Sequence, residues 1–134
     1  MQKIITLAVF SATMLLVSCS KQPDKVLPRK TGNWNISILY STLSVTQKES
    51  GTISFTKNNA YTSTTTSNGD TYNDSGSWKY DKAGKKITLS SNKQDGISLT
   101  YDVLEMKSKS EKWKGTTNSL SGGDITTIDV ALTK

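Results

Sequence analysis

From position 32 to position 134 the chain is a series of short runs in which apolar and polar residues alternate. The first run shows the pattern most clearly, with Trp34, Ile36 and Ile38 separated by single polar residues. A period of two matches the side-chain repeat of a β-strand, whereas an amphipathic helix requires a period of 3.6. Ser and Thr, which are mediocre helix formers, supply 34 of the 116 residues after position 18. The sequence therefore predicts an all-β domain.

Eight strands are predicted, separated by Gly, Asn, Asp and Ser residues that favour turns. The alternation slips by one residue between Val103 and Leu104, which is the effect of a β-bulge. Three longer connections are predicted to be loops, over residues 41–49, 68–76 and 118–124. The strands are expected at about 32–40, 51–55, 60–67, 78–80, 87–89, 97–103, 113–117 and 128–132.

Short connections restrict how these strands can pair. A parallel pair needs a crossover of a dozen or more residues, so strands joined by short loops must be antiparallel. An antiparallel eight-stranded meander closes most naturally as an up-and-down barrel, which also hides both sheet edges. A two-sheet β-sandwich is the alternative, because the number of strands alone does not distinguish the two. The sequence thus predicts one β domain over residues 32–134.

The first eighteen residues differ from the rest of the chain in composition. Lys3 precedes a nearly uncharged apolar run over residues 4–17, which is shorter than a membrane span and typical of a secretory signal peptide. The run leads into Leu-Val-Ser-Cys at positions 16–19, which resembles the lipobox of bacterial lipoproteins. This resemblance implies removal of residues 1–18 and lipidation of Cys19, the only cysteine, which would anchor the protein to a membrane. An ordinary signal peptide followed by a free cysteine is the alternative.

Residues 19–31 are predicted to form an extended, flexible basic tether between the lipidated cysteine and the domain. Residues 20–31 contain both prolines of the chain, no periodic apolar pattern and a net charge of +3. Residues 31–134 carry only +2, so the formal net charge of +6 does not indicate a basic surface for nucleic acid. The charge on the tether suits either attraction to anionic lipid headgroups or solvation of a linker.

The opening of the domain carries a family resemblance. Gly32-Asn33-Trp34 resembles the G-x-W start of lipocalins, in which the Trp closes the base of the barrel. The resemblance implies a lipocalin-like barrel with Trp34 at its base, and the avidin family is a remote alternative. The second lipocalin motif, a T-D-Y-type turn, is not clearly present, so the resemblance implies the fold more than the ligand. Later segments resemble the lipocalin-like domains of small bacterial lipoproteins in order and spacing, namely 51–55, 60–61, 76–80, 86–89 and 101–104.

The residue types present argue against catalysis. The chain has no His, the commonest general base and metal ligand, and its one Cys is assigned to the lipid. No Gly-rich phosphate loop is present. Asn68, Asp70, Asn73 and Asp74 lack the regular spacing of a calcium loop and are interpreted as turn formers. We therefore expect no enzymatic activity, no cofactor and no metal site.

A binding or interaction module remains. The first hypothesis is that the barrel mouth holds a small apolar or amphipathic ligand. Small barrels can instead be filled completely by their own side chains. The second hypothesis is therefore a structural or protein-interaction lipoprotein that uses its loops, including Leu43 and Val45. The inward-phased candidates for a ligand-binding wall are Ile36, Ile38, Phe55, Tyr61, Tyr80, Leu99 and Tyr101.

Both hypotheses place the protein in the same compartment. A signal peptide with a lipobox implies export and lipid anchoring in the bacterial cell envelope. Ser20 follows the cysteine in place of the Asp associated with inner-membrane retention in some bacteria, so the outer membrane is favoured. The expected partners are the membrane, through the anchor, and a small ligand.

Overall fold

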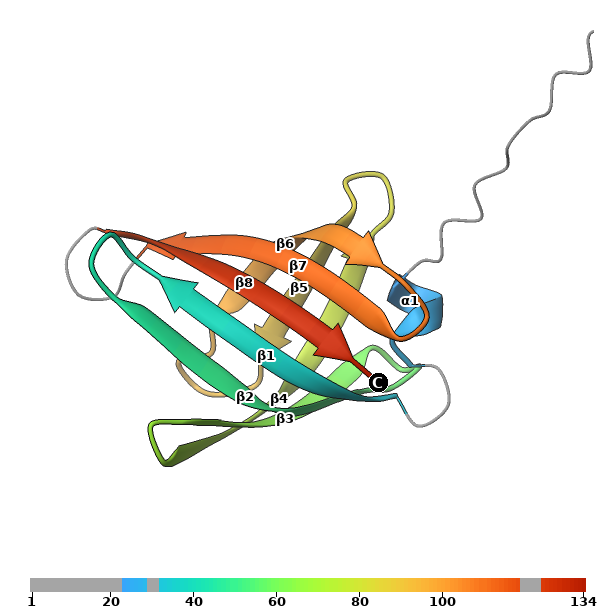
Figure 1. Cartoon of the computed structure of the whole chain (residues 1–134). Helices are drawn as coiled ribbons and strands as arrows, with labels where there is room; N and C mark the ends of the chain where they lie inside the picture. The colour runs from blue at the N-terminus through green and yellow to red at the C-terminus, as the bar shows by residue number, and fades with distance from the viewer. Residues whose placement is uncertain (1–22, 29–31, 119–123) are drawn as a thin grey trace, which may run out of the picture.

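The period-two runs of the sequence form strands in the computed structural model, which describes residues 23–28, 32–118 and 124–134 (Figure 1). One helical turn, α1 (Pro23–Val26), precedes the strands. Within the described ranges, no helix is long and apolar enough to cross a bilayer. The strands are β1 (Asn33–Ser41), β2 (Thr46–Phe55), β3 (Ala60–Ser67), β4 (Asp70–Asp81), β5 (Lys86–Ser91), β6 (Ser98–Met106), β7 (Ser110–Asn118) and β8 (Ile125–Thr133).

The sheet closes on itself. Each strand pairs antiparallel with the next in the chain, and residues 35–41 of β1 also pair with β8. This closure confirms the predicted up-and-down barrel and excludes the two-sheet sandwich. The predicted bulge is confirmed as well, because the register of β6 against β7 shifts between Val103 and Glu105.

Two of the predicted loops are shorter in the structure than predicted, because part of each belongs to a strand. The hairpin between β3 and β4 turns at Asn68-Gly69, whose φ angles of 51° and 89° suit a two-residue turn. Residues 70–76 belong to β4 and pair with β3, where Thr64 Oγ1 donates a 2.8 Å hydrogen bond to Asn73 Oδ1. Cross-strand pairing therefore outweighs the turn preference of Asn and Asp. Residues 46–49 likewise belong to β2, and residues 119–123 of the third predicted loop lie outside the described residues.

The connections between strands divide the barrel into two ends. We call the end with the β1–β2, β3–β4 and β5–β6 connections the mouth, and the opposite end, where α1 lies, the base (Figure 1). At the base the inward side chains are large. The ring of Phe55 lies 5.8 Å from that of Trp78 and 6.2 Å from that of Trp113, both edge-on. Together with the buried Trp34, these rings form an aromatic layer that fills the base.

The prediction of an extended tether is wrong for residues 23–28. This segment contains α1, and its Val26 and Leu27 are buried in the core at the base of the barrel. Leu27 is 0% exposed, and its carbonyl oxygen accepts a 2.9 Å hydrogen bond from Trp34 Nε1. A buried indole N–H needs an acceptor, and this carbonyl supplies it. Burial of Val26 and Leu27 then outweighs the freedom of an extended segment. The rest of the predicted tether, residues 19–22 and 29–31, lies outside the described residues.

Gly32 brings the chain from this segment into β1. Its φ of 67° is in the left-handed region, and a Cβ atom there would lie 2.0 Å from the carbonyl oxygen of Phe55. The Phe55 N–H donates a 3.0 Å hydrogen bond to the Gly32 carbonyl oxygen. Only glycine allows this close approach, which explains the first position of the G-x-W sequence in physical terms.

We expect Leu27→Ala to lower the free energy of unfolding by about 2–5 kcal/mol, the usual effect of truncating a buried leucine. Leu43→Ala is the matched control, because Leu43 is 94% exposed, and its effect should stay within about 0.5 kcal/mol. Urea denaturation followed by tryptophan fluorescence measures both variants. Equal stability of the two would show that residues 23–28 are not part of the folded domain.

Candidate functional site

A cavity lies between the aromatic layer and the mouth. Its volume is about 470 Å³, within the range of about 300–1,000 Å³ usual for small-molecule pockets. The interior of the barrel is therefore hollow on the side of the mouth, and the alternative of a completely filled barrel does not hold. Aliphatic side chains supply much of the wall, namely Ile36, Ile38, Ile53, Leu89 and Leu99.

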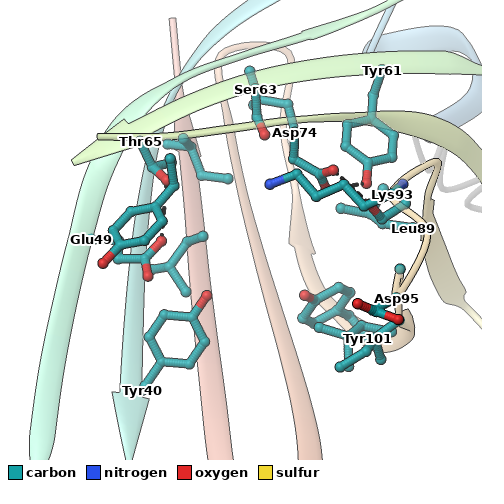
Figure 2. Close-up of a pocket in the computed structure, with 18 of the residues that line it drawn as sticks. Tyr40, Glu49, Tyr61, Ser63, Thr65, Asp74, Leu89, Lys93, Asp95 and Tyr101 are labelled. Atoms are coloured by element: carbon teal, nitrogen blue, oxygen red, sulfur yellow. Dashed lines mark hydrogen bonds between the residues drawn. The ribbon is translucent and has the colours of Figure 1, made fainter. Parts of the chain in front are cut away.

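Polar side chains share this wall with the aliphatic ones. Figure 2 shows Tyr40 and Glu49 on one side of the cavity, with Tyr61, Asp74 and Tyr101 on the other. These five residues come from five strands, β1, β2, β3, β4 and β6 in the order of the chain. The cavity also reaches the connection between β5 and β6, where Lys93 and Asp95 lie. A ligand here would meet apolar wall and a small number of polar groups together.

Asp74 is held by hydroxyl groups. Tyr61 Oη donates a 2.7 Å hydrogen bond to its Oδ2, and Ser91 Oγ donates a 2.6 Å bond to its Oδ1. Burial opposes ionisation of this carboxyl, but the bonds from Ser91, Tyr61 and the Ser75 backbone, with the charge of Lys93, hold its pKa below the ordinary value. Burial and the bond to Asp74 raise the pKa of Tyr61. Both oxygens of Asp74 are thus engaged by the protein itself.

Glu49 is engaged much less. Thr65 Oγ1 donates a 3.1 Å hydrogen bond to Glu49 Oε2. Among the described residues, no Lys or Arg forms an ion pair with this carboxylate. Burial, followed by the negative charge of Glu49, raises the pKa of Tyr40 to about 12. Burial, followed by Tyr40 and Glu49, also raises the pKa of Tyr101, so both phenols are neutral at physiological pH.

Tyr101 is positioned by its neighbours on β7. A Cβ atom on Gly115 would lie 2.7 Å from Tyr101 Cδ1, so the glycine makes room for the ring. The ring of Trp113 lies 6.0 Å from that of Tyr101. The Tyr101 side chain is only 5% exposed, and within the described part of the chain its hydroxyl has no hydrogen-bond partner. Among the described residues only Glu111 Oε1 is a fully buried side-chain polar atom without a partner, so the Tyr101 hydroxyl is accessible from the cavity and available to a ligand.

The structure separates the predicted ligand-binding residues into two groups. Phe55 belongs to the aromatic layer at the base, and Tyr80 packs against the core without lining the cavity. Trp34 lies at the base, where Lys134 Nζ sits 4.7 Å from its ring centroid. The predicted residues that do line the cavity are Ile36, Ile38, Tyr61, Leu99 and Tyr101.

The carboxylates of Glu49 and Asp74 on the cavity wall were not among the predicted site residues, although the sequence contains a signal for them. Glu49 is in phase with Gly51, Ile53 and Phe55, and Asp74 is in phase with Gly76, Trp78 and Tyr80. Extending each period-two run toward the mouth would have placed both acids inside the barrel.

Over residues 23–28, 32–118 and 124–134, no group of three His, Cys, Asp or Glu side chains is placed to hold a metal ion.

The rim of the mouth carries exposed apolar side chains. Leu43 and Val45 from the β1–β2 connection and Ile97 beside β6 are exposed. A neighbouring hollow of about 390 Å³ includes Val45 and Ile97 and shares Tyr40 and Leu99 with the cavity wall. An apolar molecule that approaches the mouth therefore meets apolar surface before it reaches the cavity.

A third carboxyl group lies inside the barrel, at the base. Glu111 is fully buried, and Trp113 Nε1 donates a 2.8 Å hydrogen bond to its Oε2. Its Oε1 is buried and has no partner within the described residues. Burial raises the pKa of Glu111 from 4.5 to about 7, although the bond from Trp113 acts in the opposite direction. Near neutral pH this carboxyl is therefore close to half protonated.

Comparison with known proteins shows a likeness in fold. No protein-family model and no curated protein matches the chain. Among solved structures, the chain is similar to aphrodisin, a sex pheromone from female hamster, at 16% identity and a TM-score of 0.43, over 76% of this chain and 71% of that one. A likeness this weak supports no inference about a ligand. The closed eight-strand pairing itself establishes the up-and-down barrel.

We expect the stability of the protein to fall as pH rises from 5 to 8. The folded state keeps a proton on Glu111 up to about pH 7, whereas the unfolded chain releases it near 4.5, so deprotonation favours unfolding. The loss should be about 3 kcal/mol, and Glu111→Gln should remove this dependence and be the more stable protein at pH 8. Urea denaturation at several pH values measures the effect.

The matched control for this prediction is Glu105→Gln, because Glu105 pairs with Lys107 at 3.4 Å and its pKa lies below the ordinary value. Its titration falls outside the window from pH 5 to pH 8, so the control should retain the wild-type slope. The assignment to Glu111 would be rejected by a Glu111→Gln variant that keeps this slope.

Proposed function

We propose that this protein is an exported lipoprotein whose lipocalin-like barrel binds a small apolar or amphipathic molecule. The observation that carries the proposal is the cavity of about 470 Å³ inside the barrel, whose lining reaches the β5–β6 connection at the mouth. Such a pocket, mainly apolar with a few polar groups, is the usual form of a small-molecule site. The exposed apolar rim provides an entrance for a molecule of the same character.

Binding without chemistry suits the residues that line the cavity. The chain has no His and its one Cys is Cys19, far from the barrel strands in sequence. Tyr40 and Tyr101 are neutral, and Asp74 is engaged by two hydroxyls and remains a carboxylate. These groups can orient a ligand through hydrogen bonds. The Ser91 hydroxyl does lie next to the Asp74 carboxylate, but the pKa of Asp74 is below its ordinary value, which makes this carboxylate a weak general base near neutral pH.

Anchoring through Cys19 would leave the mouth accessible. The proposal rests on the lipobox-like residues 16–19 and on the apolar run before them. Because α1 begins at Pro23 and lies at the base, the anchor would join the barrel at the end opposite the mouth (Figure 1). A ligand could then enter from the side away from the membrane. We place the anchored protein in the bacterial cell envelope, with the outer membrane favoured.

The cavity is tested by filling it. We expect the neutral apolar dye N-phenyl-1-naphthylamine to bind the wild-type protein, and Leu99→Trp to weaken this binding at least about tenfold by occupying the cavity. Leu104→Trp is the matched control, since it makes the same change on the same strand at an exposed position. Dye fluorescence titration measures both. Equal weakening by the two variants, or no binding to the wild type, would reject the cavity as the site.

The anchor is tested by removing the thiol. We expect the wild-type protein, expressed in a bacterial host, to sediment with membranes and to incorporate radiolabelled palmitate. Cys19→Ala should move to the soluble fraction and lose the label, because one acylated cysteine is the whole anchor. Thr13→Ser, a conservative change in the apolar run before the lipobox, is the control for general effects on export and should behave as the wild type does. A Cys19→Ala protein that stays in the membrane fraction would contradict the lipoprotein assignment.

A further inference from the structure

We infer that the ligand carries a protonated amine, which binds between Glu49, Tyr40 and Tyr101 while its apolar part occupies the aliphatic wall of the cavity. The inference rests on the proposed function and names the chemical class of its ligand. It depends on the charge of the cavity, on the unequal engagement of its two deep carboxylates, and on hydroxyl groups without partners.

The cavity as a whole favours a cation. Three carboxylates line it, Glu49, Asp74 and Asp95, against one ammonium group, that of Lys93. Little of this excess negative charge is screened by water once an apolar molecule fills the space, so the electrostatic interactions strengthen. An anionic headgroup would face repulsion there, and a neutral one would leave a carboxylate with reduced hydration.

Glu49 is the carboxylate that remains available. Asp74 accepts bonds from Tyr61 and Ser91 on its two oxygens and is also compensated by Lys93. Glu49 accepts one bond, from Thr65, on one oxygen only. Its other oxygen has no partner within the described residues. A ligand ammonium would complete the hydrogen bonding of this group.

The two tyrosines complete the site for an ammonium group. Figure 2 shows the hydroxyls of Tyr40 and Tyr101 directed into the cavity from its two sides, with the Glu49 carboxylate on the side of Tyr40. Glu49 pairs with Ile38 across β1 and β2, so Tyr40 is the next inward residue beside it, and Tyr101 faces them from β6 across the cavity. A primary ammonium has three N–H donors, which matches one carboxylate oxygen and two phenol oxygens as acceptors. The tyrosine rings add a favourable cation–π interaction.

The apolar part of the ligand is accommodated by the remaining wall. Ile38 and Leu99 are half-buried and line the cavity near Tyr40 and Tyr101 in the strands. Leu89 faces the same space from β5. The volume of about 470 Å³ holds an alkyl chain of moderate length together with its headgroup. The ligand class is therefore a small amphipathic primary amine.

The experiment compares three molecules with the same alkyl chain, n-decylamine, n-decanol and sodium decanoate, at pH 7. Each is titrated against the full-length protein bound to N-phenyl-1-naphthylamine, and displacement of the dye gives the affinity. We expect decylamine to bind at least about tenfold more tightly than decanol, the usual gain from a hydrogen bond to a charged group, and decanoate to bind most weakly.

Variants locate the headgroup. In Glu49→Gln the advantage of decylamine over decanol should fall to about twofold or less, because the variant loses the charge that attracts the ammonium and that penalises a neutral headgroup. Asp102→Asn removes the same charge from the exposed partner of Lys86, and it should keep the wild-type preference. Tyr101→Phe should weaken decylamine more than decanol, and it tests the site independently if Glu49→Gln does not fold.

The outcomes separate this inference from the proposed function. If decanol displaces the dye and decylamine is no better, the inference is overturned while the binding function stands. Retention of the amine preference in both Glu49→Gln and Tyr101→Phe also overturns it, because the ammonium would then bind elsewhere. If none of the three molecules displaces the dye, or the dye itself does not bind, the proposed function fails together with the inference.

Discussion

Closure of the sheet between β1 and β8 is the constraint on which the rest of this structure depends. A closed sheet has no free edge, and its alternate side chains must all enter one narrow interior. Whether that interior is solid or hollow then depends on the size of the side chains at each height. Four aromatic residues fill the base, from Trp34 to Trp113, and smaller or polar residues near the mouth leave the cavity. A single barrel thus has one end filled by aromatic side chains and one end that contains a cavity.

The interior carboxyl groups show how local partners give three different properties to one type of residue. Asp74 is ionised because two hydroxyls and a nearby lysine favour its charge. Glu111 has one indole donor and an orphan oxygen, so burial dominates and favours the protonated form. Glu49 has one hydroxyl donor and faces the open cavity. Of these three carboxyl groups, Glu49 is the one that combines incomplete hydrogen bonding with access for a ligand, which is why it carries the inferred specificity.

Much of the fold could be predicted, because a strand is a local property of the chain. The period of two, the turn residues and the slip near Val103 led to eight antiparallel strands with a bulge, and the structure has them. The failures occurred where distant contacts outweigh local preference. Residues 70–76 look like a turn by composition but pair along β3. Residues 23–28 look like a linker but pack against the base. There the Trp34 indole N–H donates a hydrogen bond to the Leu27 carbonyl oxygen, and the Leu27 side chain is buried.

The sequence by itself determined the class of fold, the inward or outward direction of each strand residue, and the lipobox-like character of the N-terminal segment. Only the tertiary structure decided the height of each inward residue, meaning its position along the barrel axis between the base and the mouth. Phe55 and Tyr61 are both inward, yet the first belongs to the base and the second to the cavity. Glu49 and Tyr101 are far apart in the chain and face each other across the cavity. The reason is that side-chain direction follows from the backbone of one strand, whereas height depends on the stagger between strands and on closure.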